Sequence, residues 1–356
     1  MAARIERTSA TTSELPAERP SKQILLHVFD ILCQTAFCEL NQDQIRAYKN
    51  EISPLKDLKE ESGKYLLIAD KLSKIASEIL KKEVRQEVRQ NSFAFDIFLN
   101  SPCHKALKDL NEVYQEIFYL YFEKENIGKS IDIAKKMSTG ESQEILFVKI
   151  AEYYLQKGNP EAASKIVRED LDSSFSKQEK LFTEIAEYYL QKDKPEAASK
   201  IVRKDLKSFS IREKLFTEIA GYYLKNDNPE AASKIVREDL KSFSIREKLF
   251  TEITKCYLQK GNPEAASNIV REDLKSFSIR EKLFTEIAEY YLKNDKPEAA
   301  AKIVKNDLKG ASSEQEKLLA EIARAFLRDG KKTQAENAAN SIRSATLKKL
   351  ILSEIE

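Results

Sequence analysis

The sequence predicts an all-α fold in which tandem helical hairpins stack into a solenoid, and three observations indicate it. The first is a period, because Lys-Leu-Phe-Thr-Glu-Ile begins at Lys180, Lys214, Lys248 and Lys282, always 34 residues apart. The second is composition: glycine provides 8 of 356 residues and proline 9, whereas 33% are charged. Few helix breakers and many charges favour helices over a turn-rich β fold. The third is an apolar pattern with helical spacing in each unit.

The first helix of each unit, helix A, is predicted from a recurring Ser-x-x-Glu motif. Ser210-Ile-Arg-Glu213 has the spacing of a capping box, in which the serine hydroxyl binds an N–H of the first turn and the glutamate reaches back to the cap. Copies of the box occur at Ser176/Glu179, Ser244/Glu247, Ser278/Glu281 and Ser313/Glu316. The apolar positions that follow in one unit are Leu215, Phe216, Ile219, Ala220 and Tyr223. We therefore expect helix A to start at this box.

The second helix, helix B, is predicted from a proline that follows a polar turn. Pro-Glu-Ala-Ala begins at Pro160, Pro195, Pro229, Pro263 and Pro297. Proline suits the first turn of a helix, where its missing N–H costs nothing. The residue before it is an expected N-cap in three units, at Asn159, Asn228 and Asn262. Each unit is then an antiparallel hairpin with more apolar surface than it can bury alone, so neighbouring units must stack.

The repeat resembles the tetratricopeptide repeat family, which has a characteristic residue pattern in 34 positions. The matching residues of one unit are Phe182, Ile185, Ala186, Tyr189, Ala198 and Val202, and Gly158 supplies the turn glycine of the preceding unit. The resemblance implies a right-handed α-solenoid. The sequence departs from the pattern at Asp205, where alanine is expected, and at Ser210, where proline is expected. We therefore expect a shorter helix B and a slightly different angle between repeats.

The organisation that follows from this reading has five parts. They are a disordered tail at 1–22, a non-repeat helical region at 23–110, a degenerate unit at 111–144, six repeats at 145–343 and a C-terminal capping helix at 344–356. The tail is rich in Ser, Thr, Glu, Arg and Pro. An apolar stripe at 65–79 is compatible with a short coiled coil, but a helix packed on the first hairpin is favoured because the stripe spans only two heptads.

Several classes of function lack support in the sequence. The four cysteines form no C-x-x-C pair, only two histidines are present, and no catalytic or phosphate-binding motif is visible. We therefore expect neither an enzyme nor a metal or other cofactor. The charges almost cancel, with 60 basic and 58 acidic residues, so nucleic acid is an unfavoured partner. No apolar run is long enough to span a membrane, and the N-terminal stretch lacks the apolar core of a cleavable signal.

The family resemblance implies a protein-interaction scaffold in which helix A lines a concave groove and binds a protein or an extended peptide. The residues expected to face the groove are Lys180, Thr183, Glu184, Glu187, Lys214, Thr217, Glu218, Lys248, Thr251, Glu252, Lys255, Lys282, Thr285, Glu286 and Glu289. A lysine row thus lies beside a glutamate row. The alternative is that i, i+4 pairing merely keeps the helix soluble, since recent duplication copies surface residues whether or not they are used.

Other functions of helical repeats remain open at this point. Members of the family that hold the carboxylate tail of chaperones resemble one another in a clamp of Lys, Asn and Arg, whereas the clamp positions here hold Thr183, Glu184 and Glu187. Acidic side chains would repel a carboxylate, so a co-chaperone is disfavoured. An RNA-binding protein, as in the similar pentatricopeptide family, is one alternative. A bacterial secretion chaperone or secreted effector is another. We expect a cytoplasmic protein, or alternatively an effector secreted without a cleavable signal.

Overall fold

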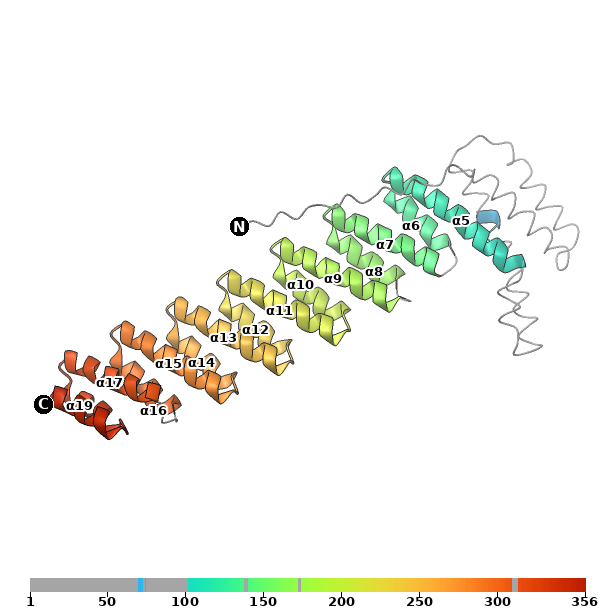
Figure 1. Cartoon of the computed structure of the whole chain (residues 1–356). Helices are drawn as coiled ribbons and strands as arrows, with labels where there is room; N and C mark the ends of the chain where they lie inside the picture. The colour runs from blue at the N-terminus through green and yellow to red at the C-terminus, as the bar shows by residue number, and fades with distance from the viewer. Residues whose placement is uncertain (1–69, 73, 75–101, 138–139, 172–173, 309–312) are drawn as a thin grey trace, which may run out of the picture. The chain divides into compact units, whose positions relative to one another are not determined.

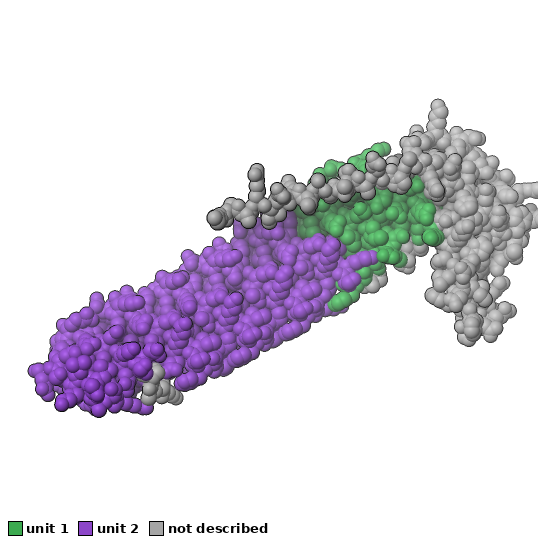
Figure 2. All heavy atoms as spheres, in the orientation of Figure 1, with its two compact units in different colours: residues 1–175 green, residues 176–356 purple. Residues whose placement is uncertain are grey.

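The structure is a computed structural model whose described part forms two compact units, residues 1–175 and residues 176–356, coloured separately in Figure 2. The residues that it describes are 70–72, 74, 102–137, 140–171, 174–308 and 313–356. The predicted disordered tail, the apolar stripe apart from a few of its residues, and most of the 23–110 region lie outside these residues.

Every element of the described part is an α-helix (Figure 1). The first unit contains α5 (Pro102–Glu123), α6 (Ile127–Lys136), α7 (Glu141–Gln156) and α8 (Pro160–Asp170). The second contains α9 (Phe175–Gln191), which begins at the last residue of the first unit, then α10 (Pro195–Asp205), α11 (Phe209–Lys225), α12 (Pro229–Glu238), α13 (Phe243–Gln259), α14 (Pro263–Glu272), α15 (Phe277–Lys293), α16 (Pro297–Asp307), α17 (Ser313–Arg328), α18 (Lys332–Asn340) and α19 (Ala345–Ile355). The prediction of an all-α fold is confirmed for these residues.

The helices pair as hairpins, as the sequence predicts. α5 packs on α6 and α7 on α8 in the first unit, and α11, α13, α15 and α17 each pack on the next helix in the second. Odd-numbered helices from α9 to α17 are therefore A helices, and even-numbered helices from α10 to α18 are B helices. α5 begins before residue 111, so the helix of the degenerate unit starts within the stretch assigned to the non-repeat region.

The core of a hairpin is made by the residues that the apolar pattern picks out. In α11 the side chains of Phe216 and Ile219 have no exposed surface, and Ala232 and Val236 of α12 are equally buried. The small Ala232 allows the two helices to approach closely. Burying a side chain such as Phe216 is worth roughly 1.5–3 kcal/mol relative to leaving it in water.

The turn between helix A and helix B has the predicted cap. The side chains of Asn159, Asn228 and Asn262 each accept the backbone N–H of the residue three positions later, at 3.0 Å. Just before this cap the backbone adopts the left-handed conformation, with φ of 73° at Gly261 and 53° at Asp227. Glycine and aspartate are among the few residue types that tolerate this conformation.

The predicted capping box is wrong. α11 begins at Phe209, so Ser210 lies inside the helix. The side chain of the N-cap Ser208 makes no capping hydrogen bond, and its hydroxyl instead lies 3.2 Å from that of Ser210. Glu213 is buried and turns toward the loop that opens the next repeat, where its carboxylate accepts the backbone N–H groups of Lys241 at 2.7 Å and Ser242 at 3.2 Å. The reason is solvation: N–H groups in a first helical turn can bind water, whereas those of a partly buried loop need a protein partner.

The same bond recurs along the second unit. The carboxylates of Glu179, Glu247 and Glu316 accept backbone N–H groups of the next inter-repeat loop, 28 or 29 residues later, at 2.6–3.3 Å. Each of these glutamates therefore ties its own helix A to the start of the next repeat. We name these three residues and Glu213 the tether glutamates.

A ladder of ion pairs explains the departure from the family pattern at the end of helix B. Arg203, Arg237 and Arg271 bind Asp239, Asp273 and Asp307 at the C-terminal end of the following B helix, with closest N–O distances of 2.5–2.6 Å. The aspartate side chains are only 7–9% exposed. An alanine at this position could not hold the arginine, so the aspartate replaces apolar packing with a charged link between repeats.

Candidate partner-binding face

The predicted groove residues lie on α9, α11, α13 and α15, and we call the surface that they form the A-helix face. All four helices belong to the second unit except for the first residue of α9. α11 contacts α13, and α13 contacts α15, so corresponding positions lie on adjacent helices. The predicted groove side chains are exposed or half-buried, because the apolar side of each A helix packs inward.

The lysine and glutamate rows meet where α9 lies beside α11. The Lys214 ammonium is 3.7 Å from the carboxylates of both Glu187 and Glu218, and Lys180 is 3.7 Å from Glu184. The Lys214 side chain is 63% exposed. Ion pairs that are this long and this exposed contribute roughly 0–1 kcal/mol. These side chains are therefore available to a partner without loss of the fold.

The threonines of the A-helix face have a local structural role. The hydroxyl groups of Thr183, Thr217, Thr251 and Thr285 donate to the backbone carbonyl four residues earlier, at 2.7–3.0 Å. A hydroxyl that donates within its own helix can still accept a hydrogen bond. The threonines thus offer a partner an acceptor and a methyl group, but no free donor.

The face is not uniform along the solenoid, because one position changes charge. Glu187 in α9 corresponds to Gly221 in α11, Lys255 in α13 and Glu289 in α15. With Lys248 and Lys255 against Glu252, the predicted groove residues of α13 sum to +1, whereas those of α9 and α15 each sum to −1. A ligand that follows the face meets its most positive part at α13.

A second surface was missed by the sequence reading. Phe209, Phe243 and Phe277 are the first residues of α11, α13 and α15, and they are 61–65% exposed. We call them the phenylalanine row. The sequence signal for this surface is the recurring Ser-Phe-Ser, whose last serine opens the Ser-x-x-Glu motif of these repeats. The phenylalanine seven residues later in each repeat is the buried one, as at Phe216.

The phenylalanine row lies in an electropositive setting. The first turns of α11, α13 and α15 contain no acidic residue, and the start of a helix carries a partial positive charge. Lys207, Lys241 and Lys275, two residues before each phenylalanine, are exposed. The row therefore combines large apolar side chains with positive charge, a combination that suits acidic and aromatic ligands.

Within the described residues, no group of three or more His, Cys, Asp and Glu side chains is arranged to hold a metal ion. Searched over the same residues, no helix has the length and apolar character needed to cross a bilayer.

Comparison with known proteins adds little beyond the architecture. No family model matches the chain, and no curated protein matches it. Among solved structures, a putative kinesin light chain from Podosopora anserina with TPR-like repeats is 18% identical, covers 48% of this chain and 94% of its own, and has a TM-score of 0.25. The pilF protein of Pseudomonas aeruginosa is 17% identical, with coverages of 59% of this chain and 97% of its own and a TM-score of 0.24.

A tetratricopeptide repeat protein from Parabacteroides merdae is 15% identical, with coverages of 69% and 98% and a TM-score of 0.27. Values this low give no basis for transferring function from these proteins. The 34-residue helical-hairpin repeat that carries the family resemblance is instead confirmed by the helices of this chain itself.

Proposed function

We propose that this chain is a non-enzymatic scaffold that binds a protein or an extended peptide along the A-helix face. The observation that carries the proposal is that Lys and Glu side chains recur at equivalent surface positions of successive A helices. The fold does not depend on these side chains. Lys214 illustrates this, since both of its carboxylate partners are 3.7 Å away. A partner that approaches can replace these weak pairs with its own charges.

The charge distribution favours a ligand of mixed charge. The positive region at α13, between the acidic ends at α9 and α15, suits a segment with acidic residues at its centre and basic residues on either side. A free C-terminal carboxylate is a poor ligand near α9, because Glu184 and Glu187 would repel it.

The test reverses the charge of one row. Lys214→Glu, Lys248→Glu and Lys282→Glu, combined in the full chain, should abolish capture of the partner found by affinity pull-down. Surface substitutions usually change stability within about ±0.5 kcal/mol, so the variant should melt almost as the parent does. The matched control is Lys200→Glu, Lys234→Glu and Lys302→Glu, which makes the same change in charge at exposed positions of the B helices.

The expected result is loss of the partner in the first variant alone. Retention of full binding by both variants would exclude the A-helix face. Equal loss in both would indicate an effect of overall charge rather than of this face.

A second candidate, single-stranded RNA, is favoured by the phenylalanine row. Exposed aromatic side chains beside lysines can stack bases, and each stacked base contributes about 1–3 kcal/mol. Binding of a fluorescent oligouridine that weakens steeply with salt, and that is lost in the variant Phe209→Ser, Phe243→Ser, Phe277→Ser, would support this candidate. Absence of binding at low salt would exclude it.

A further inference from the structure

Two junctions between hairpins of the second unit contain a node of three side chains. It consists of the arginine of one B helix, the phenylalanine anchor of the next A helix and the aspartate at the end of the next B helix. Arg203 binds Asp239 at 2.5 Å, and its guanidinium lies 5.9 Å from the ring centroid of Phe216. In this node the phenylalanine ring packs in the junction, and the aspartate neutralises the arginine that reaches across it.

The node is repeated further along the chain. Arg271 binds Asp307 at 2.6 Å and lies 5.8 Å from the ring centroid of Phe284. The spacing from arginine to aspartate is 36 residues in each case. This regularity makes it possible to identify the residues that stand in the corresponding places at the last junction.

At the last junction all three side chains differ. The arginine position holds Lys305, the aspartate position 36 residues later holds Ser341, and the anchor position holds Leu319. Compared with the two nodes described above, this junction therefore lacks an arginine guanidinium, a carboxylate and an aromatic ring. Leu319 remains half-buried, whereas Phe216 and Phe284 have no exposed surface.

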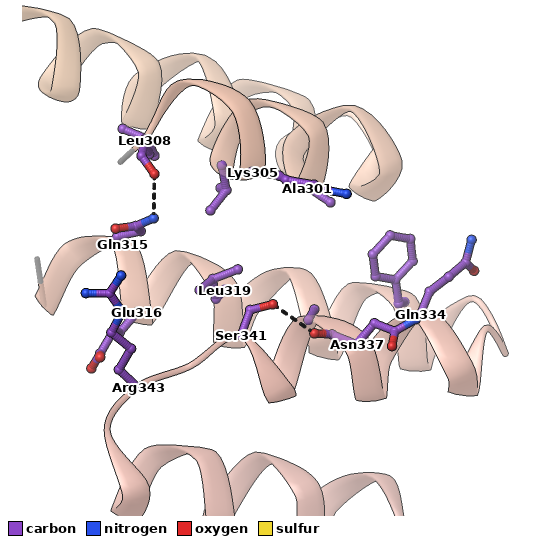
Figure 3. A pocket seen from close by; sticks show the side chains of 13 residues that line it. Ala301, Lys305, Leu308, Gln315, Glu316, Leu319, Gln334, Asn337, Ser341 and Arg343 are labelled. Carbon is purple, nitrogen blue, oxygen red and sulfur yellow. Dashed lines mark hydrogen bonds between the residues drawn. The ribbon is translucent and has the colours of Figure 1, made fainter. Parts of the chain in front are cut away.

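A cleft of about 590 Å³ opens at this place, between α16, α17 and α18 (Figure 3). Its apolar lining includes Val304, Leu308 and Ala338. Its polar lining is formed by Lys305, Gln315, Glu316, Gln334, Asn337, Ser341 and Arg343. The cleft thus has an apolar wall and a rim of amide, hydroxyl and charged groups.

The charges of the cleft do not balance. Lys305 and Arg343 are cationic, and among the described residues no carboxylate lies within ion-pair distance of either. Glu316 is the acidic residue of the lining, and its carboxylate accepts the backbone N–H of Ser344 at 3.0 Å. The lining of the cleft therefore has a net charge of +1, whereas the arginine–aspartate nodes of the preceding junctions are neutral.

We propose that this cleft is a binding site for a segment of a partner protein in which an acidic residue adjoins an aromatic one. The carboxylate replaces that of the missing aspartate and pairs with Lys305, while the ring occupies the space beside Leu319. The amides of Gln334 and Asn337 lie on the rim, where they can bind the backbone of a peptide. This site is separate from the A-helix face and does not depend on the function proposed for it.

The first test uses a blocked dipeptide, acetyl-Asp-Phe-amide, with the full chain, and ligand-observed NMR titration as the readout. Acetyl-Asn-Phe-amide lacks the carboxylate, acetyl-Asp-Ala-amide lacks the ring, and phenylacetate is a small aromatic anion without a peptide backbone. We expect the Asp-Phe probe to bind at least tenfold more tightly than each of the other three. Equal affinities for the Asp and Asn probes would overturn the proposal, and phenylacetate binding as tightly as the dipeptide would indicate a small-molecule site instead.

The second test rebuilds the node. The triple variant Lys305→Arg, Leu319→Phe, Ser341→Asp should fill the cleft, melt at the same or a higher temperature and bind the Asp-Phe probe at least tenfold more weakly. A folded rebuilt variant with parental affinity would contradict the proposal. Lys305→Gln is an independent test if the rebuilt variant does not fold. This substitution should lower the affinity for acetyl-Asp-Phe-amide to that for acetyl-Asn-Phe-amide.

Discussion

The carboxylate of Glu213 accepts the backbone N–H of Lys241 at 2.7 Å, although the two residues are 28 positions apart. The bond connects a helix A to the loop that opens the next helix A, so each repeat holds its successor through a polar contact as well as through apolar stacking. Apolar stacking tolerates small shifts, whereas a hydrogen bond of this length fixes the position of the loop.

Glu213→Ala is expected to lower the free energy of unfolding by about 1–3 kcal/mol, because it leaves two partly buried backbone N–H groups without their acceptor. Urea unfolding of the full chain, followed by circular dichroism, measures the change. The matched control is Glu218→Ala, one turn and a residue later on the same helix, which should stay within about 0.5 kcal/mol. Equal effects of the two substitutions would show that the hydrogen bonds of Glu213 do not contribute to the free energy of unfolding.

Removal of residues 215–248 should leave a folded, soluble and helical protein. After the deletion Glu213 lies 28 positions before Lys275, and Arg203 lies 36 positions before Asp273, so both types of contact between repeats are restored with new partners. Solenoid units contact mainly their neighbours. Far-UV circular dichroism and size-exclusion chromatography measure the outcome. Aggregation of this deletion, with a folded parent under the same conditions, would be incompatible with interchangeable repeats.

Two glycine substitutions are expected to act in opposite directions. Gly261 has a φ of 73°, and an added Cβ would lie 3.3 Å from the Tyr290 hydroxyl, so Gly261→Ala should cost about 1–2 kcal/mol. Gly221 lies inside α11 with no atom near its added Cβ, so Gly221→Ala should stabilise by about 0.5–1 kcal/mol. Thermal melts of both variants give the comparison. Stabilisation by Gly261→Ala would contradict the left-handed turn.

Stability should fall as pH rises from 10 to 12 in a way that depends on Tyr291. Burial and a hydrogen bond to Glu264, at 2.9 Å, raise the pKa of this phenol from 10.0 to about 12. The unfolded chain therefore loses the proton first, and the stabilising contribution that is complete below pH 10 is lost as pH approaches 12. One pKa unit corresponds to about 1.4 kcal/mol, so the loss reaches about 1.4 kcal/mol at pH 11.

The measurement compares urea unfolding of the parent and of Tyr291→Phe at pH 8 and pH 11. The variant should be less stable by about 1 kcal/mol at pH 8, because it lacks the hydrogen bond, and the difference should vanish at pH 11. Tyr290→Phe serves as the neighbouring control for loss of a phenol. A difference that is constant with pH would refute the assignment.

The repeat, the hairpins and the core could be predicted because they depend on local spacing. The period of 34 residues locates every unit, and the asparagine before proline correctly predicts the N-caps such as Asn228. These signals need only the chemistry of a single helix or turn, and that chemistry is contained in a few adjacent residues.

The contacts between repeats could not be predicted in the same way. The motif Ser210-x-x-Glu213 fits a local capping box, but the partner of Glu213 is 28 residues away, and a period alone does not reveal which distant groups become buried together. The phenylalanine row was missed for a related reason. The N-cap is Ser208, two residues before the Ser210 that the box implies, and this shift places Phe209 at the exposed start of the helix.

Each tether glutamate binds N–H groups at the same number of residues along the chain, and each arginine of the ladder binds its aspartate at a constant spacing. This regularity has a consequence for how such a chain can change in evolution. A gene that gains or loses one whole repeat by unequal recombination restores every bridge between the new neighbours, because each donor finds an identical acceptor at the same offset. An insertion of any other length breaks a bridge at its boundary. The number of repeats in such a chain can therefore change in discrete steps of one hairpin, and the length of the A-helix face would change with it.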